Sequence, residues 1–307
     1  MSTKTIAVIR SMRPSFLLLT PVCVLLGVAI AIQLHGHVRI DLCVLVLIGA
    51  LSAHISVNTF NEYLDFASGL DNLTDRTPFS GGSGGIPDFP CAHNNVLVIA
   101  VATLLITSLI GLYLVSVTGY LLLIPGLIGV LLILGYTRII NRLPMLCLIS
   151  PGLAFGPFFV VGTYISVTDP LLVDQAGLTA AFLVSLVPFF LVNNLLLLNQ
   201  FPDVDADKRV GRNTFPIAYG VRNSMGIYLA FNLLAAISIG LTYLLEATHW
   251  LTLIAVLPLI LGLNIYKGVI NANFDIQKMI PFMGKNVALT LFTSLAMGLL
   301  ILVSTRL

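Results

Sequence analysis

Long apolar runs with almost no charged residues fill most of this 307-residue chain. Each run is long enough for the roughly 20 residues that a helix needs to cross the hydrocarbon core of a bilayer. Outer-membrane β-barrels instead use short segments of alternating polarity, so the runs predict an all-α, polytopic membrane protein. We expect nine transmembrane helices, at approximately residues 15–34, 41–63, 95–117, 119–139, 144–167, 177–200, 224–245, 249–269 and 286–304.

The composition excludes the main alternatives. Only 9% of the residues are charged and 58% are hydrophobic, whereas soluble domains carry roughly 25% charged residues. A soluble enzyme and a disordered chain, which needs low hydropathy, are therefore both excluded. The formal net charge of +2 gives no reason to expect a nucleic-acid partner, and the lipid bilayer is the expected environment.

The distribution of basic residues predicts the orientation. With nine spans and a cytoplasmic amino terminus, thirteen of the fifteen Lys and Arg residues fall on the cytoplasmic side. Cytoplasmic loops are enriched in these residues. We therefore expect the amino terminus inside the cell and the carboxyl terminus outside, with only Arg39 and Arg306 on the outer side.

The few acidic residues concentrate in two clusters on the predicted cytoplasmic side, and the first follows the second apolar run. Asn61 and Asp65 are spaced i, i+4 and share a helix face, and Asn58 lies a turn earlier on roughly the same face. Gly69 is expected to end the helix, which leaves Asp71 on the following loop.

The second cluster follows the sixth apolar run. Asp203 and Asp207 again have i, i+4 spacing, whereas Asp205 would point elsewhere in a helix. Pro202 loosens the helix just before them because proline lacks a backbone donor.

These residue types favour a divalent cation bound with a phosphate. Oxygen ligands without clustered Cys or His suit Mg²⁺, which holds few carboxylates and commonly bridges to phosphate oxygens. Basic residues adjoin both clusters, including Arg76 and Lys208, and they would neutralise a diphosphate. A single DxxxD at a helix end is more often a surface pair. Two clusters on one side of so apolar a chain favour a metal–diphosphate site.

Other interpretations remain open from the residues alone. A cation-coupled transporter would carry its acids near the membrane midplane, whereas these lie at helix ends. The glycine-rich segment 80–85 could form a backbone anion nest, a mobile cap or a plain loop. His54, inside the second span, could bond a neighbouring helix or face a cavity, and we favour the structural role.

The two acidic motifs resemble those of the UbiA-type intramembrane prenyltransferases. The first family motif, N-D-x-x-D with a further Asp six residues on, is matched by Asn61-Glu-Tyr-Leu-Asp65 and Asp71. The second, D-x-x-x-D followed by basic residues and Gly, is matched by Asp203-Val-Asp-Ala-Asp207-Lys-Arg-Val-Gly211. The likeness also includes Arg13-Pro14, Tyr136-Thr137 and Gly156–Tyr164, and so covers nearly the whole chain. We therefore expect residues 1–307 to form a single domain.

The resemblance implies a helical bundle around a central cavity with a cytoplasmic polar cap. Members transfer a prenyl group from a polyprenyl diphosphate to an acceptor, usually an aromatic ring. By position, Mg²⁺ and the diphosphate are expected to be held by Asn61, Asp65, Asp203 and Asp207, with Asp71 assisting. The diphosphate is also expected to contact Arg76, Lys208 and Arg138. The substrate cavity is expected to be lined by Asn58 and Tyr136.

Within this family, the sequence is most similar to the 1,4-dihydroxy-2-naphthoate prenyltransferases of menaquinone synthesis, in the inner membrane of a bacterial or archaeal cell. It departs from the family pattern in three places. Glu62 replaces the usual Asp, Ile140 stands where many members carry Lys, and residues 148–152 replace a Gly-x-Gly-Glu stretch. The identity of the acceptor therefore stays open between 1,4-dihydroxy-2-naphthoate and a different acceptor on the same fold. The oligomeric state stays open as well.

Overall fold

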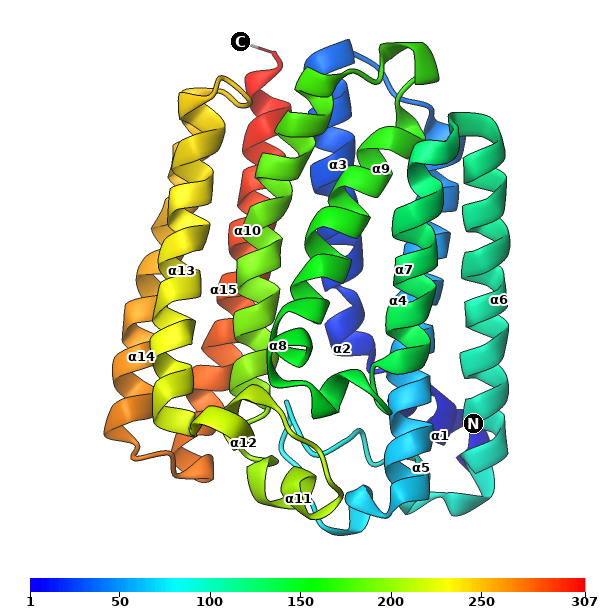
Figure 1. Cartoon of the computed structure of the whole chain (residues 1–307), viewed down its shortest axis with the longest axis vertical. Coiled ribbons are helices and arrows are strands. Elements are labelled where there is room, and N and C mark those ends of the chain that lie inside the picture. The colour runs from blue at the N-terminus through cyan, green and yellow to red at the C-terminus, as the bar shows by residue number, and fades with distance from the viewer. Residues whose placement is uncertain (307) are drawn as a thin grey trace.

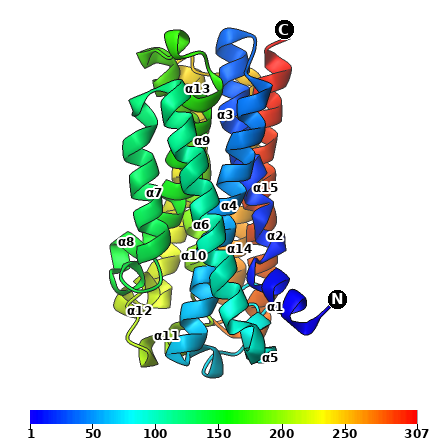
Figure 2. The same ribbon diagram turned by 90° about the vertical axis from the view of Figure 1, so that its right-hand side faces the viewer.

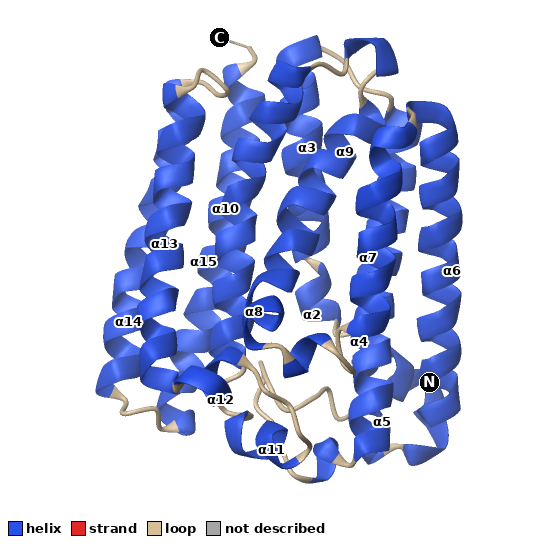
Figure 3. Ribbon diagram, viewed as in Figure 1, coloured by secondary structure: helices blue, strands red, loops and turns tan. Residues whose placement is uncertain are grey.

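The computed structural model of the chain describes residues 1–306, which contain helices and no strand. The long helices run side by side in one bundle (Figures 1 and 3). In chain order, the helices are α1 (Thr3–Ser11), α2 (Pro14–Leu17), α3 (Leu19–His35), α4 (Ile40–Ser68), α5 (Gly85–Asp88), α6 (His93–Thr118), α7 (Leu123–Gly135), α8 (Pro144–Leu153), α9 (Phe159–Val167), α10 (Gln175–Asn199), α11 (Val204–Arg209), α12 (Phe215–Tyr219), α13 (Val221–Leu244), α14 (Ile260–Asn271) and α15 (Ile276–Ser304).

In the part of the chain that the structure describes, eight helical segments are long and apolar enough to cross a membrane. They match eight of the nine predicted spans. The remaining prediction, at 119–139, corresponds to Tyr120–Gly135, which is apolar but shorter than the other eight. The all-α polytopic fold is thus confirmed, and the exact count of nine spans is not.

Helix α10 forms the centre of the bundle. In its apolar stretch, 67% of the residues are buried, against only 11% in the segment that contains α6. Helix α10 packs against α13, α8, α15 and α9, whereas α6 and α7 lie on the right-hand side of the bundle in Figure 1 and face the viewer in Figure 2. The apolar side chains of α6 therefore face outward, as a lipid environment allows.

Short helices gather at one end of the bundle. Helices α1, α5, α11 and α12 lie at the bottom of Figure 1 together with the amino terminus, and the chain ends at the opposite, upper end. Both acidic clusters belong to this lower end, because α4 ends there and α11 lies there. The short helices form the cap that the family resemblance implies, and termini at opposite ends agree with an odd number of crossings.

The helix that forms one wall of the interior is irregular in its middle. Helices α8 and α9 are joined by a π-helical turn, Ala154–Phe158, and the segment contains Pro151 and Pro157. Proline removes a backbone donor and favours this kind of irregularity. Gly156 allows the turn to approach α10, because a Cβ atom there would lie 2.6 Å from the carbonyl oxygen of Ser185. The turn thereby presents Phe155 toward the bundle interior.

Candidate active site

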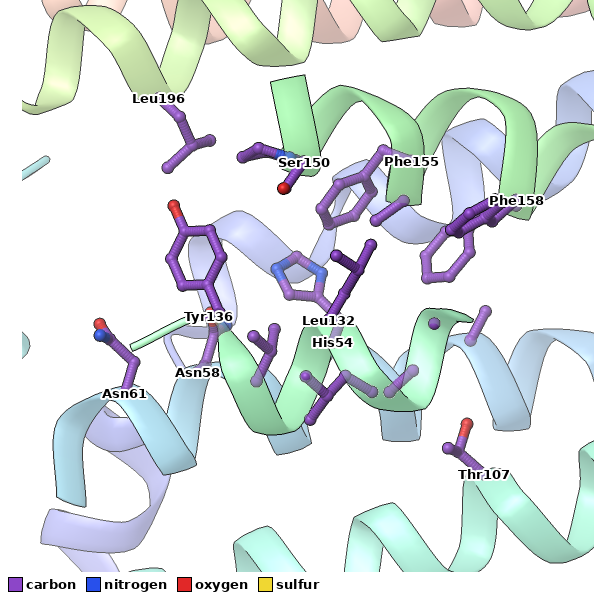
Figure 4. Close-up of a pocket in the computed structure, with 18 of the residues that line it drawn as sticks. His54, Asn58, Asn61, Thr107, Leu132, Tyr136, Ser150, Phe155, Phe158 and Leu196 are labelled. Carbon is purple, nitrogen blue, oxygen red and sulfur yellow. The ribbon is translucent and has the colours of Figure 1, made fainter. Parts of the chain in front are cut away.

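A cavity of about 610 Å³ opens inside the bundle above the short helices. Its deeper part is apolar and is formed by α4, α6, α7 and α9, whereas its end near the cap is polar. Figure 4 shows this polarity change, from Asn61 and Asn58 at one side, through Tyr136 and His54, to Phe155 and Phe158. Such a cavity can hold an apolar chain whose polar head lies at the cap.

The first acidic cluster faces this cavity. Asn58, Asn61 and Asp65 on α4 all line it, as their shared helix face predicts. Gly69 ends the helix with a φ of 77°, a conformation that favours glycine. The chain then turns so that Asp71, which is buried, also lines the cavity.

The second cluster reaches the same cavity from a distant part of the chain. Helix α10 ends at Asn199, and α11 begins at Val204 after a turn that contains Pro202. Asp203 and Asp207 line the cavity, and Asp205 is exposed to solvent. The prediction that Asp203 and Asp207 share one face, with Asp205 directed elsewhere, is confirmed.

One arginine joins the two clusters. The guanidinium of Arg212 donates to Asp207 Oδ1 at 2.9 Å and also to Asp65 Oδ1. These three side chains are at most 15% exposed. Because Asp65 and Asp207 contact the same guanidinium, carboxylates from distant stretches of the sequence converge at one point.

A second arginine approaches from the amino-terminal segment. Arg13 lies between α1 and α2 with a φ of 53°, which is unusual for a residue other than glycine. Its Nε and Nη2 atoms donate to Glu62 Oε1 at 3.0 and 2.6 Å. Glu62 itself is fully buried and does not line the cavity, so its role is to anchor Arg13.

The glycine-rich segment connects the clusters as well. The backbone N–H of Gly81 donates to Asp203 Oδ2 at 3.1 Å, and Ser83 donates to Glu62 from both its backbone and its hydroxyl. Ser80, Gly81 and Gly82 line the cavity. This segment therefore forms part of the wall at the polar end, and the N–H of Gly81 contacts a carboxylate.

Burial raises the proton affinity of the acids in the cap. Burial, together with the neighbouring Asp207, raises the pKa of Asp203 to about 7, although the Gly81 N–H, Arg13 and Arg212 act in the opposite direction. Burial and the nearby Glu62 and Asp65 raise the pKa of Asp71 to about 7.

The pKa of Asp207 is raised as well. Burial causes the increase, and Arg212 offsets part of it. Four aspartates and two arginines line this cavity, so the carboxylates lack full compensation. A cation entering the polar end would relieve their mutual repulsion.

The donor set fits a cation that is shared with a phosphate better than an ion held by protein alone. Within residues 1–306, no three Asp, Glu, His or Cys side chains lie close enough to hold a metal ion by themselves. Two buried carboxylate oxygens, Asp71 Oδ2 and Asp203 Oδ1, have no hydrogen-bond partner within residues 1–306. Mg²⁺ commonly takes one or two carboxylates and completes its shell with water and phosphate oxygens.

The three basic residues predicted to contact a diphosphate lie elsewhere. Arg76 pairs with Asp88 Oδ1 at 2.8 Å and is 37% exposed, and Lys208 and Arg138 are exposed. None of the three is among the described residues that line the cavity. Arg76 and Arg138 stand in loops, where sequence spacing does not fix the direction of a side chain. Lys208 follows Asp207 directly on α11, so it is turned about 100° around the helix axis from that carboxylate.

Arg13 and Arg212 line the cavity instead. The sequence patterns alone do not single them out as site residues, although Arg13 precedes Pro14 and Arg212 follows Asp207 of the second motif by five residues. Gly211, with a φ of 79°, reverses the chain so that Arg212 points back to Asp207.

The two residues predicted to line the substrate cavity are both found there. Tyr136 follows α7 and Asn58 lies on α4 (Figure 4). Asn58 Nδ2 also donates to the carbonyl oxygen of Met12 at 3.0 Å, which ties α4 to the amino-terminal segment. Asn61 Nδ2 donates to Thr137 Oγ1 at 3.2 Å, so the first motif also links α4 to the end of α7.

Comparison with known proteins agrees with this arrangement. Residues 20–275 match the UbiA prenyltransferase family. The chain is 30% identical over 247 residues to the 1,4-dihydroxy-2-naphthoate octaprenyltransferase of Bacillus subtilis, covering 78% of this chain and 74% of that protein. It is 24% identical over 206 residues to the digeranylgeranylglyceryl phosphate synthase of Natronomonas pharaonis, covering 67% of each.

The fold is also that of a solved relative. A UbiA homologue from Archaeoglobus fulgidus, determined bound to DMAPP and Mg²⁺, superposes with a TM-score of 0.62 at 16% identity, over 96% of this chain and 99% of that one. The chain belongs to the UbiA prenyltransferase family. It is an integral, multi-pass membrane enzyme that uses a polyprenyl diphosphate as donor.

Proposed function

We propose that this enzyme transfers the prenyl group to an aromatic acceptor, 1,4-dihydroxy-2-naphthoate, with Mg²⁺ bound at the polar end of the cavity. The observation that carries the proposal is the convergence of Asp65 and Asp207 on Arg212 inside one cavity. The naphthoate acceptor is supported by the similarity to the Bacillus subtilis enzyme, whose name specifies it.

In this proposal, Asn61, Asp65, Asp71, Asp203 and Asp207 hold the metal and diphosphate. Mg²⁺ would supply charge stabilisation for the departing diphosphate. Arg13 and Arg212, which line the cavity, take the diphosphate-binding role that the sequence pattern suggested for Arg76, Lys208 and Arg138. An arginine fork suits phosphate oxygens because it offers several donors in a fixed plane.

The chain's own residues then favour transfer over hydrolysis. The bond between the allylic carbon and the diphosphate oxygen breaks, and the leaving diphosphate retains the electron pair. Tyr136 lies on the cavity wall where its ring can face the allylic cation. An electron-rich, hydrogen-bearing ring carbon of the acceptor forms the new carbon–carbon bond with the cation. The proton that leaves this carbon passes to the departed diphosphate, which restores the aromatic ring. The apolar walls from α4, α6 and α7 hold the chain and exclude water.

We further propose that residues 1–307 act as one domain in the inner membrane of a bacterial or archaeal cell. The amino terminus and the cap would face the cytoplasm, and the carboxyl terminus would lie outside. The support is the excess of basic residues at the cap end and the placement of the termini at opposite ends of the bundle.

The test is transfer by the purified protein in lipid nanodiscs. Labelled polyprenyl diphosphate is supplied with and without Mg²⁺, together with 1,4-dihydroxy-2-naphthoate, 4-hydroxybenzoate or glyceryl phosphate. We expect Mg²⁺-dependent product with the naphthoate. Product with another acceptor would contradict the naphthoate assignment, and ion flux in proteoliposomes without any product would favour the cation-coupled transporter.

Matched variants of the second cluster complete the experiment. Asp203→Asn should abolish transfer, because Asp203 lines the cavity, and Asp205→Asn should retain it, because Asp205 is exposed two residues away. Equal activity in the two variants would refute the assignment of the metal–diphosphate site.

A further inference from the structure

A histidine lies in the cavity beyond the acidic end. His54 is on the same face of α4 as Asn58 and Asn61, is 6% exposed and lines the cavity. It precedes Asn61 by seven residues, which corresponds to about 10 Å along a helix axis. His54 is therefore displaced from the proposed diphosphate site by about the length that a diphosphate and a reacting carbon would occupy.

One nitrogen of this imidazole is held by a neighbouring helix. His54 Nδ1 lies 2.8 Å from the hydroxyl oxygen of Thr20, a fully buried residue of α3. The rings of Phe155 and His54 form a T-shaped pair, with centroids 4.8 Å apart and an interplanar angle of 74°. These two contacts fix the ring plane, so the direction of the second nitrogen is also fixed.

The second nitrogen, Nε2, has no hydrogen-bond partner among the described residues, in contrast to Nδ1. Figure 4 shows the ring inside the cavity, between Tyr136 on one side and Phe155 and Phe158 on the other. A neutral imidazole presents either a donor or an acceptor at this nitrogen. A ligand group that hydrogen-bonds this nitrogen from inside the cavity therefore gains affinity.

The surrounding walls indicate the shape of that ligand. Phe155, Phe158 and Leu132 offer apolar and aromatic surfaces around the imidazole. The nearby hydroxyl of Ser150 already donates to the carbonyl oxygen of Leu146 at 2.5 Å. A planar ring that carries a hydroxyl group fits this part of the cavity, whereas a plain prenyl chain would leave the imidazole unpaired.

We propose that His54 binds a ring hydroxyl of the aromatic acceptor and thereby orients the ring toward the allylic carbon, with Thr20 holding the imidazole in place. The proposal rests on the function proposed above and adds the residue that recognises the acceptor. The sequence favours a structural role for His54, with a cavity-facing role as the alternative, and the geometry assigns one nitrogen to each.

Two substitutions separate these roles. In His54→Gln the amide extends to the position of Nε2, whereas in His54→Asn it reaches only as far as Nδ1. Acceptor recognition predicts that His54→Asn raises the KM for the naphthoate about 3- to 10-fold, the loss of one neutral hydrogen bond. His54→Gln should raise this KM less than His54→Asn does, because its amide still reaches the acceptor hydroxyl although it gives up the bond to Thr20. The KM for the prenyl diphosphate should not change in either variant.

A purely structural role predicts the reverse order, because only Asn would preserve the bond to Thr20. A lower thermal midpoint in His54→Gln than in His54→Asn, with an unchanged acceptor KM in both, would overturn the proposal. Thr20→Val, which releases the ring but leaves it in the cavity, should raise the acceptor KM without affecting the donor KM. The mutated residues are outside the proposed metal and diphosphate set, so Mg²⁺ dependence should persist.

The acceptor can also be varied with the wild-type protein, which avoids any folding defect. The two monomethyl ethers of 1,4-dihydroxy-2-naphthoate each block one hydroxyl. We expect one ether to lose about 3- to 10-fold in kcat/KM relative to the other, and this difference to disappear in His54→Asn. Equal use of both ethers by the wild type would contradict the inference alone, whereas no transfer to any aromatic acceptor would refute the proposed function and the inference together.

Discussion

Arg212→Lys tests whether the two acidic clusters must be joined by one guanidinium. The native fork reaches Asp207 Oδ1 at 2.9 Å and Asp65 Oδ1 at the same time. Lysine keeps the positive charge but offers one nitrogen on a flexible stem, so it can pair closely with only one of the two carboxylates.

The magnitude follows from the one hydrogen bond that lysine cannot make. A hydrogen bond between charged groups contributes about 1.5–3 kcal/mol, and these groups are at most 15% exposed, so solvent screening is limited. If that stabilisation is required in the transition state, kcat/KM for the prenyl diphosphate should fall by about 10- to 150-fold.

The assay is prenyl transfer in nanodiscs over a range of donor concentrations, with the thermal midpoint measured on the same preparations. Arg209→Lys is the matched control, because Arg209 is exposed and lies three residues away on the same segment. The control should match the wild type. An Arg212→Lys enzyme within twofold of the wild type in kcat/KM would refute the reasoning that this arginine organises the site.

Two further substitutions test the walls of the cavity. Gly129 lines the apolar end and has no atom within 4 Å of an added Cβ, so Gly129→Leu should shift the preference toward shorter prenyl diphosphates, while Gly226→Leu, at an open position outside the cavity, should not. Competition between donors of two lengths measures the ratio, and an unchanged ratio would contradict the assignment of this end to the chain. Glu62→Gln should lower the thermal midpoint in detergent, because Glu62 accepts from Arg13 and Ser83 in a fully buried position; an unchanged midpoint would show that this anchor contributes little.

The positions of the acids could be predicted because they follow helical periodicity. The i, i+4 spacing predicts that Asn61 and Asp65 share a face, and Gly69 marks the end of α4. Asp203 and Asp207 lie on either side of the start of α11, and the same spacing predicts their common direction. Periodicity is a local property, so local sequence suffices to establish it.

The arginines could not be selected in the same way. Arg212 reaches the cavity because the chain reverses at Gly211, and Arg13 because of an unusual backbone conformation between α1 and α2. Arg76 adjoins the first cluster in sequence, but Asp88 holds it outside the cavity. These directions depend on tertiary interactions between segments that are far apart in the chain.

The number of spans shows a similar limit. Hydropathy alone delimits a run at 119–139, but Gly119 and the short 3₁₀ turn at Tyr120–Leu122 delay the start of α7. The regular α-helix there begins only at Leu123 and ends at Gly135. A window of apolar residues therefore overestimates the helix, because it records composition and not the backbone conformation.

The most direct test of the account is whether both acidic clusters bind the same ion. Mn²⁺, which can replace Mg²⁺ and is visible by electron paramagnetic resonance, is titrated into nanodisc samples that contain an unreactive thiolo analogue of the prenyl diphosphate. We predict that Asp65→Asn and Asp203→Asn each weaken Mn²⁺ binding strongly, while Asp205→Asn binds as the wild type does. Weakening by only one of the two cavity substitutions, or by the exposed control to the same extent, would contradict a shared site.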